Sequence, residues 1–435
     1  MNFVKIKTFF GEHVPRDILG MAKNYSDIAL IMDSIRELSS DELNYKTLKG
    51  KRILIKPNWV LHNQKPEDEL CLRTHDSIII ALVEFICNFQ PSEVIIGDAP
   101  IQRCLWESIL STWLLSNIDR IQKASGVDIK IKDLRRRTFD PNFNNPVNDK
   151  NPIDDYVIFD LGEKSYLEPI SLSNNFRVTS YNPDRLVEAH RKGTHKYCIS
   201  KELFTADLVI SVPKVKTHQK TGITCALKNL VGINGDKDFL PHHRVGGTGF
   251  GGDCYPGKNI IRRLSEYFLD QANRKQGSVE YWLWFKSAIS LWKISHPQEV
   301  HKMSAGWYGN DTTWRMVMDL NLIAKYGRLD GTISAEPQRM IYSLCDGIVG
   351  GQGDGPLLPE PLALGVLGFT NNSLNMDIVM ATLMRFDCQK IPLLNNNHEI
   401  REIGKIILNH KEIKINELKK YSIKTKLPPG WINYL

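Results

Sequence analysis

The chain has 435 residues, of which 42% are hydrophobic and 24% charged, and its formal net charge at pH 7 is +7. This length allows one large domain with insertions or two to three smaller domains, and the hydrophobic content excludes a wholly disordered chain. The positive charge fits either a solvated surface or an anionic partner such as a phosphate, a carboxylate, a nucleic acid or an acidic lipid.

The eight cysteines are scattered along the chain, without a Cys-x-x-Cys pair. This pattern argues against a zinc ribbon, a ferredoxin-type cluster and a disulfide scaffold, and it favours reduced thiols in a cytoplasmic protein. The first residues lack the apolar core of a signal peptide, and no run of 18 uninterrupted apolar residues occurs. We therefore expect a cytoplasmic protein without a membrane span.

Short apolar runs alternate with segments of helical periodicity along most of the chain. Strands are predicted at 52–55, 94–96, 127–131, 157–161, 206–212, 340–344 and 363–369, and helices at 76–90 and 375–386. Strands separated by helices are typical of an α/β fold. The sequence thus predicts a mostly parallel, layered sheet flanked by helices.

Residues 258–330 interrupt this alternation with two helical stretches that are rich in aromatic and basic residues. Aromatic residues three to four positions apart indicate helices packed on a core. We expect a main domain of residues 1–257 with 331–410, a helical insertion at 258–330, and a basic C-terminal tail at 411–435. The lysine-rich part of the tail is predicted to be a solvated helical or frayed segment.

Polar residues follow several of the predicted strands directly, namely Asn58, Asp98, Lys214 and Asp346. In an open parallel sheet the carboxyl ends of the strands lie along one edge, where loops converge on a crevice. These four residues are therefore predicted to face one site. Each of them could instead be a turn-forming residue, because Asp and Asn are common in turns.

The segment Lys214-Val215-Lys216-Thr217-His218-Gln219-Lys220-Thr221-Gly222 follows the clearest buried strand, and a helix is predicted soon after it. A polar loop between a strand and a helix N-terminus is a common anion site. The alternative is a merely solvated basic loop. The residues predicted to bind a substrate are Lys56, Asn58, Arg191, Lys214, Lys216, Lys228, Asn229 and Asp354. No Walker motif is present, so nucleoside triphosphate hydrolysis is not supported.

Histidines are concentrated between residues 190 and 243. Neutral imidazole serves both as a general base and as a metal ligand. We predict His195 or His218 as the acid or base, with Asp98 as a third catalytic residue. A divalent metal ion would be held by His190, His242, Asp253 and Asp346. Their spacing matches no standard zinc motif, and plain polar contact with a substrate is the alternative.

Several of these motifs together resemble the domain of unknown function 362 family. They are Lys56-Pro57-Asn58, Gly97-Asp98, Pro213-Lys214-Val215-Lys216-Thr217-His218, Thr221-Gly222-Ile223-Thr224, Lys228-Asn229-Leu230-Val231-Gly232, Asp346-Gly347-Ile348, Gly353-Asp354-Gly355-Pro356 and Met376-Asp377. The resemblance spans roughly residues 50 to 390 and implies a fold and a site more than a reaction. Some members carry an appended ferredoxin-like domain and are labelled iron–sulfur proteins. The cysteines of this chain cannot supply such a cluster, so none is expected.

Three functional hypotheses follow. The first is an enzyme that acts on a small phosphorylated or carboxylated substrate by histidine acid–base chemistry, and a divalent metal ion could assist it. A transferase or a hydrolase is favoured. The second is a redox or iron–sulfur-related protein, as in other members of the family. The third is an anion-binding or nucleic-acid-binding protein without catalysis, and nucleic acid ranks last because no known nucleic-acid module is present. The sequence leaves the oligomeric state open.

Overall fold

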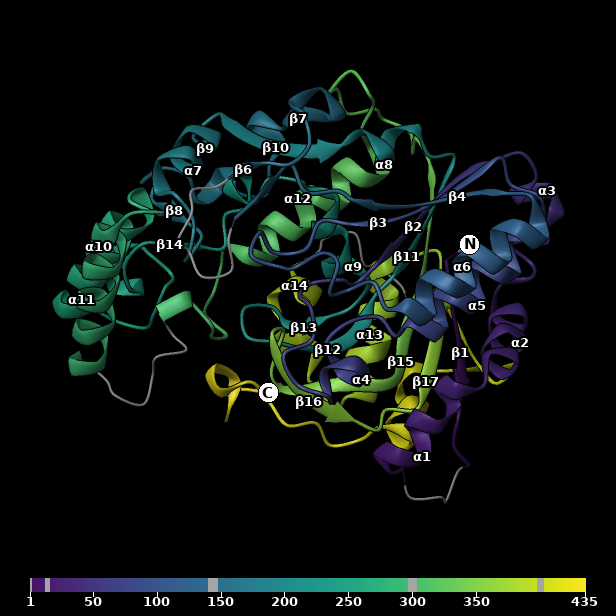
Figure 1. Ribbon diagram of the computed structural model, residues 1–435. Coiled ribbons are helices and arrows are strands. Elements are labelled where there is room, and N and C mark those ends of the chain that lie inside the picture. Colours follow the sequence, from purple (N-terminus) through teal and green to yellow (C-terminus); the bar gives the residue numbers. More distant parts are fainter. Residues whose placement is uncertain (1, 12–15, 140–147, 296–302, 397–402) are drawn as a thin grey trace.

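The computed structural model describes residues 2–11, 16–139, 148–295, 303–396 and 403–435, and a large mixed sheet forms its centre (Figure 1). The spatial order of its main strands is β19 (Lys411–Ile413), β18 (Lys405–Leu408), β1 (Phe3–Thr8), β17 (Val366–Thr370), β15 (Met340–Asp354), β11 (Leu208–Val212), β2 (Arg52–Pro57), β3 (Glu93–Asp98) and β4 (Asp128–Asp133). Strands β15, β11, β2, β3 and β4 run parallel to one another, whereas β17 is antiparallel to both of its neighbours. The predicted α/β fold with a mostly parallel sheet is confirmed.

Helices cover both faces of the sheet, because the apolar side chains of each strand alternate between the faces. In β2, Ile53 and Ile55 belong to one hydrophobic cluster, and Leu54 belongs to the other. The first cluster contains α2 (Ile28–Ser39), α5 (Asp76–Cys87) and α6 (Thr112–Ser125). The second contains α9 (Ala226–Asn229), α12 (Thr313–Tyr326) and α13 (Ser373–Leu383). The continuous apolar runs seen in the sequence are thus strands buried on both faces.

One segment of the sheet was predicted to be a loop. Residues Lys214–His218 form strand β12, which is buried throughout, runs parallel to β15, and pairs antiparallel with β13 (Gly222–Thr224). The apolar pattern of a buried strand is missing here, because four of the five residues are polar: two lysines, a threonine and a histidine. The strand is stable because its buried polar side chains have partners: Lys214 pairs with Asp346, and the Thr217 hydroxyl donates to the Gly353 carbonyl oxygen.

The region predicted as a helical insertion divides into two parts. Helices α10 (Ile260–Arg274) and α11 (Val279–Ser295) pack against each other at the edge of the molecule (Figure 1). Helix α12, by contrast, lies in the hydrophobic cluster next to the sheet. The predicted basic tail also contributes to the core, since Leu418 and Trp431 are fully buried in that cluster.

Further small elements lie between these parts. They are α7 (Pro183–Ala189), the three-stranded sheet of β7 (Tyr156–Asp160), β10 (Thr194–Ser200) and β9 (His190–Arg191), and the pair β8 (Phe176–Arg177) and β14 (His243–Arg244). Every helix within the described ranges is too short or too polar to cross a membrane.

Candidate functional site

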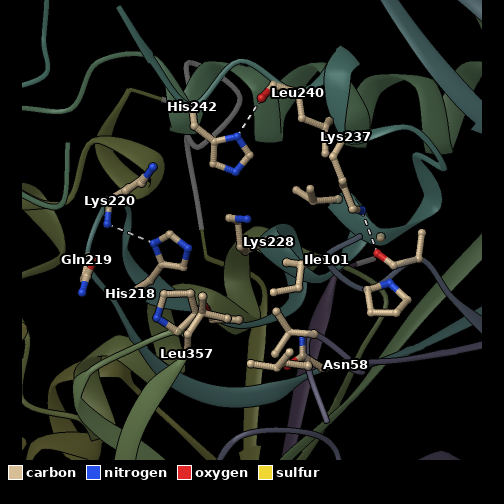
Figure 2. A pocket seen from close by; sticks show the side chains of 18 of the residues that line it. Asn58, Ile101, His218, Gln219, Lys220, Lys228, Lys237, Leu240, His242 and Leu357 are labelled. Atoms are coloured by element: carbon tan, nitrogen blue, oxygen red, sulfur yellow. Dashed lines mark hydrogen bonds between the residues drawn. The ribbon is translucent and has the colours of Figure 1, made fainter. Parts of the chain in front are cut away.

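A cavity of about 580 Å³ lies at the carboxyl ends of β2 and β3, next to β12 and α9. Its size is that of a pocket for a small molecule. The side chains that line it come from segments far apart in the sequence, and Figure 2 shows several of them pointing into one space. The ionisable groups of the lining are Lys56, Asp98, Arg103, Lys216, His218, Lys220, Lys228, Lys237, His242 and Asp354, together with Tyr181.

A buried ion pair lies in the cavity wall at the carboxyl ends of β2 and β3. Lys56 Nζ lies 2.8 Å from Asp98 Oδ1, and both side chains are almost completely buried. Asp98 also accepts hydrogen bonds from the backbone amides of Trp59 (2.7 Å) and Ala99 (2.8 Å). Gly232 packs against this pair so closely that a Cβ there would lie 1.9 Å from Asp98 Oδ1. Only glycine therefore fits at this position.

Two lysines point into the cavity without a counter-charge of their own. Among the described residues, neither Lys220 Nζ nor Lys228 Nζ has a carboxylate within ion-pair distance. Burial, and then the neighbouring Lys237, Lys220 and Lys56, lowers the pKa of Lys228 to about 7. Burial lowers the pKa of Lys220 to about 8, against the opposing effect of Cys254 and Asp253. An anion beside these ammonium groups would offset the electrostatic cost of burying them.

Two further lysines of the lining use backbone carbonyl oxygens as acceptors. Lys237 Nζ donates to Ala99 O (2.7 Å), and Lys216 Nζ donates to Leu72 O. Burial lowers the pKa of Lys216 to about 7 and that of Lys237 to about 8. Basic side chains therefore outnumber acidic ones in the lining, since the two carboxylates, Asp98 and Asp354, stand against five lysines and Arg103.

Two histidines open onto the cavity with opposite hydrogen-bonding polarity. Nδ1 of His218 accepts from the backbone amides of Lys220 (3.0 Å) and Thr221 (3.3 Å), so the proton of the neutral ring is on Nε2. Nδ1 of His242 lies 2.7 Å from the carbonyl oxygen of Leu240, which can only accept, so its Nε2 carries a lone pair. Burial, followed by nearby lysines, holds the pKa of both rings well below 6.5, so both are neutral. Figure 2 shows the two rings on either side of the Lys228 side chain.

Apolar side chains form the rest of the wall. They include Val60, Leu61, Ile101, Val178, Leu240 and Leu357. A ligand that fills this cavity would combine an anionic group with an apolar body.

The structure gathers nine of the fifteen residues that the sequence singled out. Those that line the cavity are Lys56, Asn58, Asp98, Lys216, His218, Lys228, Asn229, His242 and Asp354. Asn58 and Asn229 are hydrogen-bonded to each other (3.1 Å), and Asp354 accepts from the Gln219 side chain. The convergence predicted for the strand ends holds for Asn58 and Asp98.

Lys214 and Asp346, which were predicted at the same rim, lie outside the lining. They form an ion pair of 2.6 Å that is completely buried. Asp346 also accepts from Tyr25 Oη (2.5 Å) and from the His75 amide (3.0 Å). Neither side chain is available to a ligand in the cavity, because each is fully engaged inside the protein.

His190, Arg191 and His195 also lie outside the lining. His190 and His195 are paired across the β9–β10 hairpin, with their Nδ1 atoms 3.3 Å apart. His195 Nε2 lies 3.1 Å from both Ser171 Oγ and Glu168 Oε2. Arg191 is exposed. The two histidines form a closed polar network within the fold.

The four residues predicted as metal ligands are not brought together. His190 belongs to the hairpin, His242 to the cavity and Asp346 to the Lys214 pair. The fourth, Asp253, accepts from the Arg244 amide (2.5 Å) and the Thr312 hydroxyl (2.6 Å).

The predicted anion site at a helix N-terminus is also taken by the protein itself. Helix α9 begins at Ala226, and the amides of Ala226 (2.7 Å) and Leu227 (3.3 Å) donate to the Asp377 carboxylate. These amides are therefore unavailable to an exogenous anion.

Sequence reasoning did not select Lys220 and Lys237 as site residues. Lys220 was visible in the basic segment, two residues beyond His218. Lys237 follows the run Asn234-Gly235-Asp236, whose residue types are typical of turns and could have been recognised as a loop close to Gly232. In both cases the residue type was informative, but nothing in the sequence placed its side chain.

Fold and cavity together define an α/β protein with a basic, histidine-bearing pocket at the carboxyl ends of its parallel strands. The model of the family described as domain of unknown function (DUF362) matches residues 159–382, which is more than half of the chain. The chain belongs to this family, and the resemblance noted in the sequence is confirmed.

Other comparisons add little. No curated protein matches significantly. One solved structure with similarity is described as the crystal structure of a protein from Thermotoga maritima, a Northeast Structural Genomics Consortium target. The identity is 9% and the TM-score 0.35, and the match covers 77% of this chain. The chain spans about half of that protein, 54% of its length.

Proposed function

We propose that the protein is an enzyme that binds a small organic anion in this cavity and removes a proton from it. The observation that carries the proposal is the combination, in one cavity, of two unpaired lysines with two neutral imidazoles of opposite polarity. The lysines suit a carboxylate or phosphate group. The cavity volume suits a metabolite-sized ligand.

The hydrogen bonds support different proposed roles for the two histidines. His242 can act as the general base, because its Nε2 lone pair faces the cavity while Nδ1–H is held by Leu240. When Nε2 takes the proton, the bond from that proton to the substrate breaks and the electron pair stays on the substrate. The His242 ring becomes an imidazolium ion that keeps its bond to Leu240.

His218 cannot easily complete a proton transfer. Losing the proton on Nε2 would leave an imidazolate, because two backbone amides prevent protonation of Nδ1. Its Nε2–H is better suited to donate a hydrogen bond to an oxygen that gains negative charge in the reaction. Lys228, which lies between the two rings, would stabilise the same charge.

A binding screen followed by an exchange assay tests this proposal. Small phosphates and carboxylates are first screened by thermal shift, with native mass spectrometry to detect any ligand that copurifies. The double variant Lys220→Met/Lys228→Met should lose binding of every hit, whereas Lys286→Met, an exposed lysine on α11, should not. If the double variant binds the same anions as the wild type, the assignment of the cavity is wrong.

The second stage measures proton removal. For each ligand found, NMR in D₂O follows the exchange of its hydrogens. We expect His242→Gln to abolish exchange and retain binding, and His218→Gln to slow exchange by about 10²–10³-fold, the usual effect of removing one such donor. Exchange that persists in His242→Gln would contradict the role given to His242. The cytoplasmic location expected from the cysteine pattern is part of this proposal.

A further inference from the structure

A second cluster of ionisable side chains includes His243, the first residue of β14, which directly follows the cavity residue His242. It consists of His243, Cys254 and Glu266, and one possible ligand atom from each residue lies within 4.8 Å of those of the other two. All three residues are buried. They come from three separate segments: strand β14, the glycine-rich loop that follows it, and helix α10.

The polar groups of the cluster are incompletely satisfied by the protein. His243 Nδ1 is buried and has no hydrogen-bond partner among the described residues. Glu266 accepts from the Gly246 amide (3.0 Å) and from the Cys254 thiol, and no lysine or arginine of the described residues forms an ion pair with it. An unsatisfied buried nitrogen costs about 1–3 kcal/mol. A buried carboxylate without a cationic partner is also unfavourable.

We propose that His243, Cys254 and Glu266 bind a zinc ion. One imidazole nitrogen, one thiolate and one carboxylate oxygen are a donor set that Zn²⁺ accepts, whereas Mg²⁺ and Ca²⁺ require oxygen ligands. The thiolate and the carboxylate together neutralise the charge of the dication, and a ring nitrogen of His243 supplies the neutral ligand. Tetrahedral coordination at Zn–ligand distances of about 2.0–2.3 Å places donor atoms roughly 3.3–3.8 Å apart, so binding needs a contraction of about 1 Å.

The position of the cluster indicates a structural role. The ion would join α10 to β14 and to the loop that contains Gly246. Because His242 directly precedes His243 in the chain, fixing His243 would also restrain the backbone that presents His242 to the cavity. The site itself needs no ligand in the cavity, so it stands independently of the proposed function.

Metal analysis of the purified full-length protein provides the first test. Protein prepared without a metal-affinity step is expected to contain about one zinc ion per chain by inductively coupled plasma mass spectrometry. Cys254→Ser and His243→Ala should lower this content at least about tenfold. The control variant Cys104→Ser removes another buried thiol, and it should retain the zinc.

Cobalt substitution keeps the test decisive if a variant fails to fold. Wild-type protein stripped with a chelator and titrated with Co²⁺ should develop the near-ultraviolet charge-transfer absorption of a thiolate–cobalt bond, and Zn²⁺ should displace it. A wild type with little zinc and no such absorption would overturn the proposal. Equal absorption in Cys254→Ser and Cys104→Ser would overturn it as well, because the thiolate would then come from another residue.

Discussion

Replacement of Lys228 by methionine is expected to weaken anion binding and to stabilise the protein. The pKa of this lysine falls from 10.5 to about 7, mainly through burial. At about 1.4 kcal/mol for each tenfold change in acidity, this fall corresponds to several kcal/mol at pH 7. Because the side chain is only half-buried and faces an open cavity, solvent screens part of the cost. We expect the variant to gain about 1–3 kcal/mol and to lose binding of inorganic phosphate by about 10- to 100-fold, the value of a hydrogen bond to a charged group.

The stabilisation should depend on pH in a defined way. The folded-state pKa of about 7 lies below the unfolded value of 10.5, so between these pH values the unfolded chain holds more protons. The free energy of unfolding of the wild type therefore rises with pH in this window. The advantage of the Lys228→Met variant should be largest at pH 7 and below, and it should shrink towards pH 10.5.

Urea unfolding at pH 7 and pH 9, with calorimetric titration of phosphate at pH 7, measures both effects. The matched control is Lys286→Met, which removes the same charge from an exposed helix position and should change stability by less than about 0.5 kcal/mol. A Lys228→Met variant that is less stable at pH 7, or equally stabilised at both pH values, would refute the electrostatic account of the cavity.

Three further substitutions test the surroundings of the cavity by urea unfolding. Asp98→Asn leaves the buried Lys56 ammonium without its partner and should lower the free energy of unfolding by about 3–5 kcal/mol. The control Asp119→Asn breaks an exposed ion pair and should lower it by less than about 1 kcal/mol. Equal losses in the two variants would contradict the burial argument. Asp377→Ala removes the hydrogen-bond acceptor of two buried amides at the start of α9 and should lower the free energy of unfolding by about 1–3 kcal/mol for each amide. An unchanged urea midpoint would mean that other acceptors replace the carboxylate. Trp431→Ala should cost about 3–5 kcal/mol, and a negligible loss would show that the tail does not contribute to the core.

The fold could be predicted largely because burial leaves a periodic signal. The runs that became β2, β3 and β11 are continuously apolar, since helices cover both faces of the sheet. Strand β12 gave no such signal, because its partners are polar groups from distant segments such as Asp346. A sequence shows that a residue is polar, but it does not show whether the side chain is solvated or satisfied internally.

Two site residues at the carboxyl ends of predicted strands, Asn58 and Asp98, were placed correctly from the sequence. Residues whose orientation depends on local backbone geometry were predicted less well. Lys214 and Lys216 were both predicted to bind a substrate. A break in register between these residues, where β12 pairs with β15, accompanies their different environments, and only Lys216 lines the cavity. Bulges of this kind redirect side chains and leave no clear trace in composition.

The five-residue spacing of His190 and His195 has a structural explanation. The intervening Gly193 has a φ of 74°, which suits the tight turn of the hairpin that pairs the two rings. This spacing therefore indicated a hairpin as well as a pair of ligands, and the sequence offered no means of choosing between them.

The adjacent residues His242 and His243, at the start of β14, show how close two different proposed sites can lie in the chain. The sequence suggested His242 and Asp253 as metal ligands, whereas the cluster in the structure uses the next residue in each case, His243 and Cys254, with Glu266 from α10. Neighbouring side chains of an extended chain point in opposite directions, so a prediction that is wrong by one residue selects side chains on the opposite side. Metal ligands are therefore difficult to predict from sequence to the exact residue. In the structure, His242 lines the cavity, and the next residue, His243, belongs to the proposed zinc site. If both proposals hold, removing the ion should loosen His242, the proposed general base, as well as the helical hairpin, because His242 and His243 share a peptide bond.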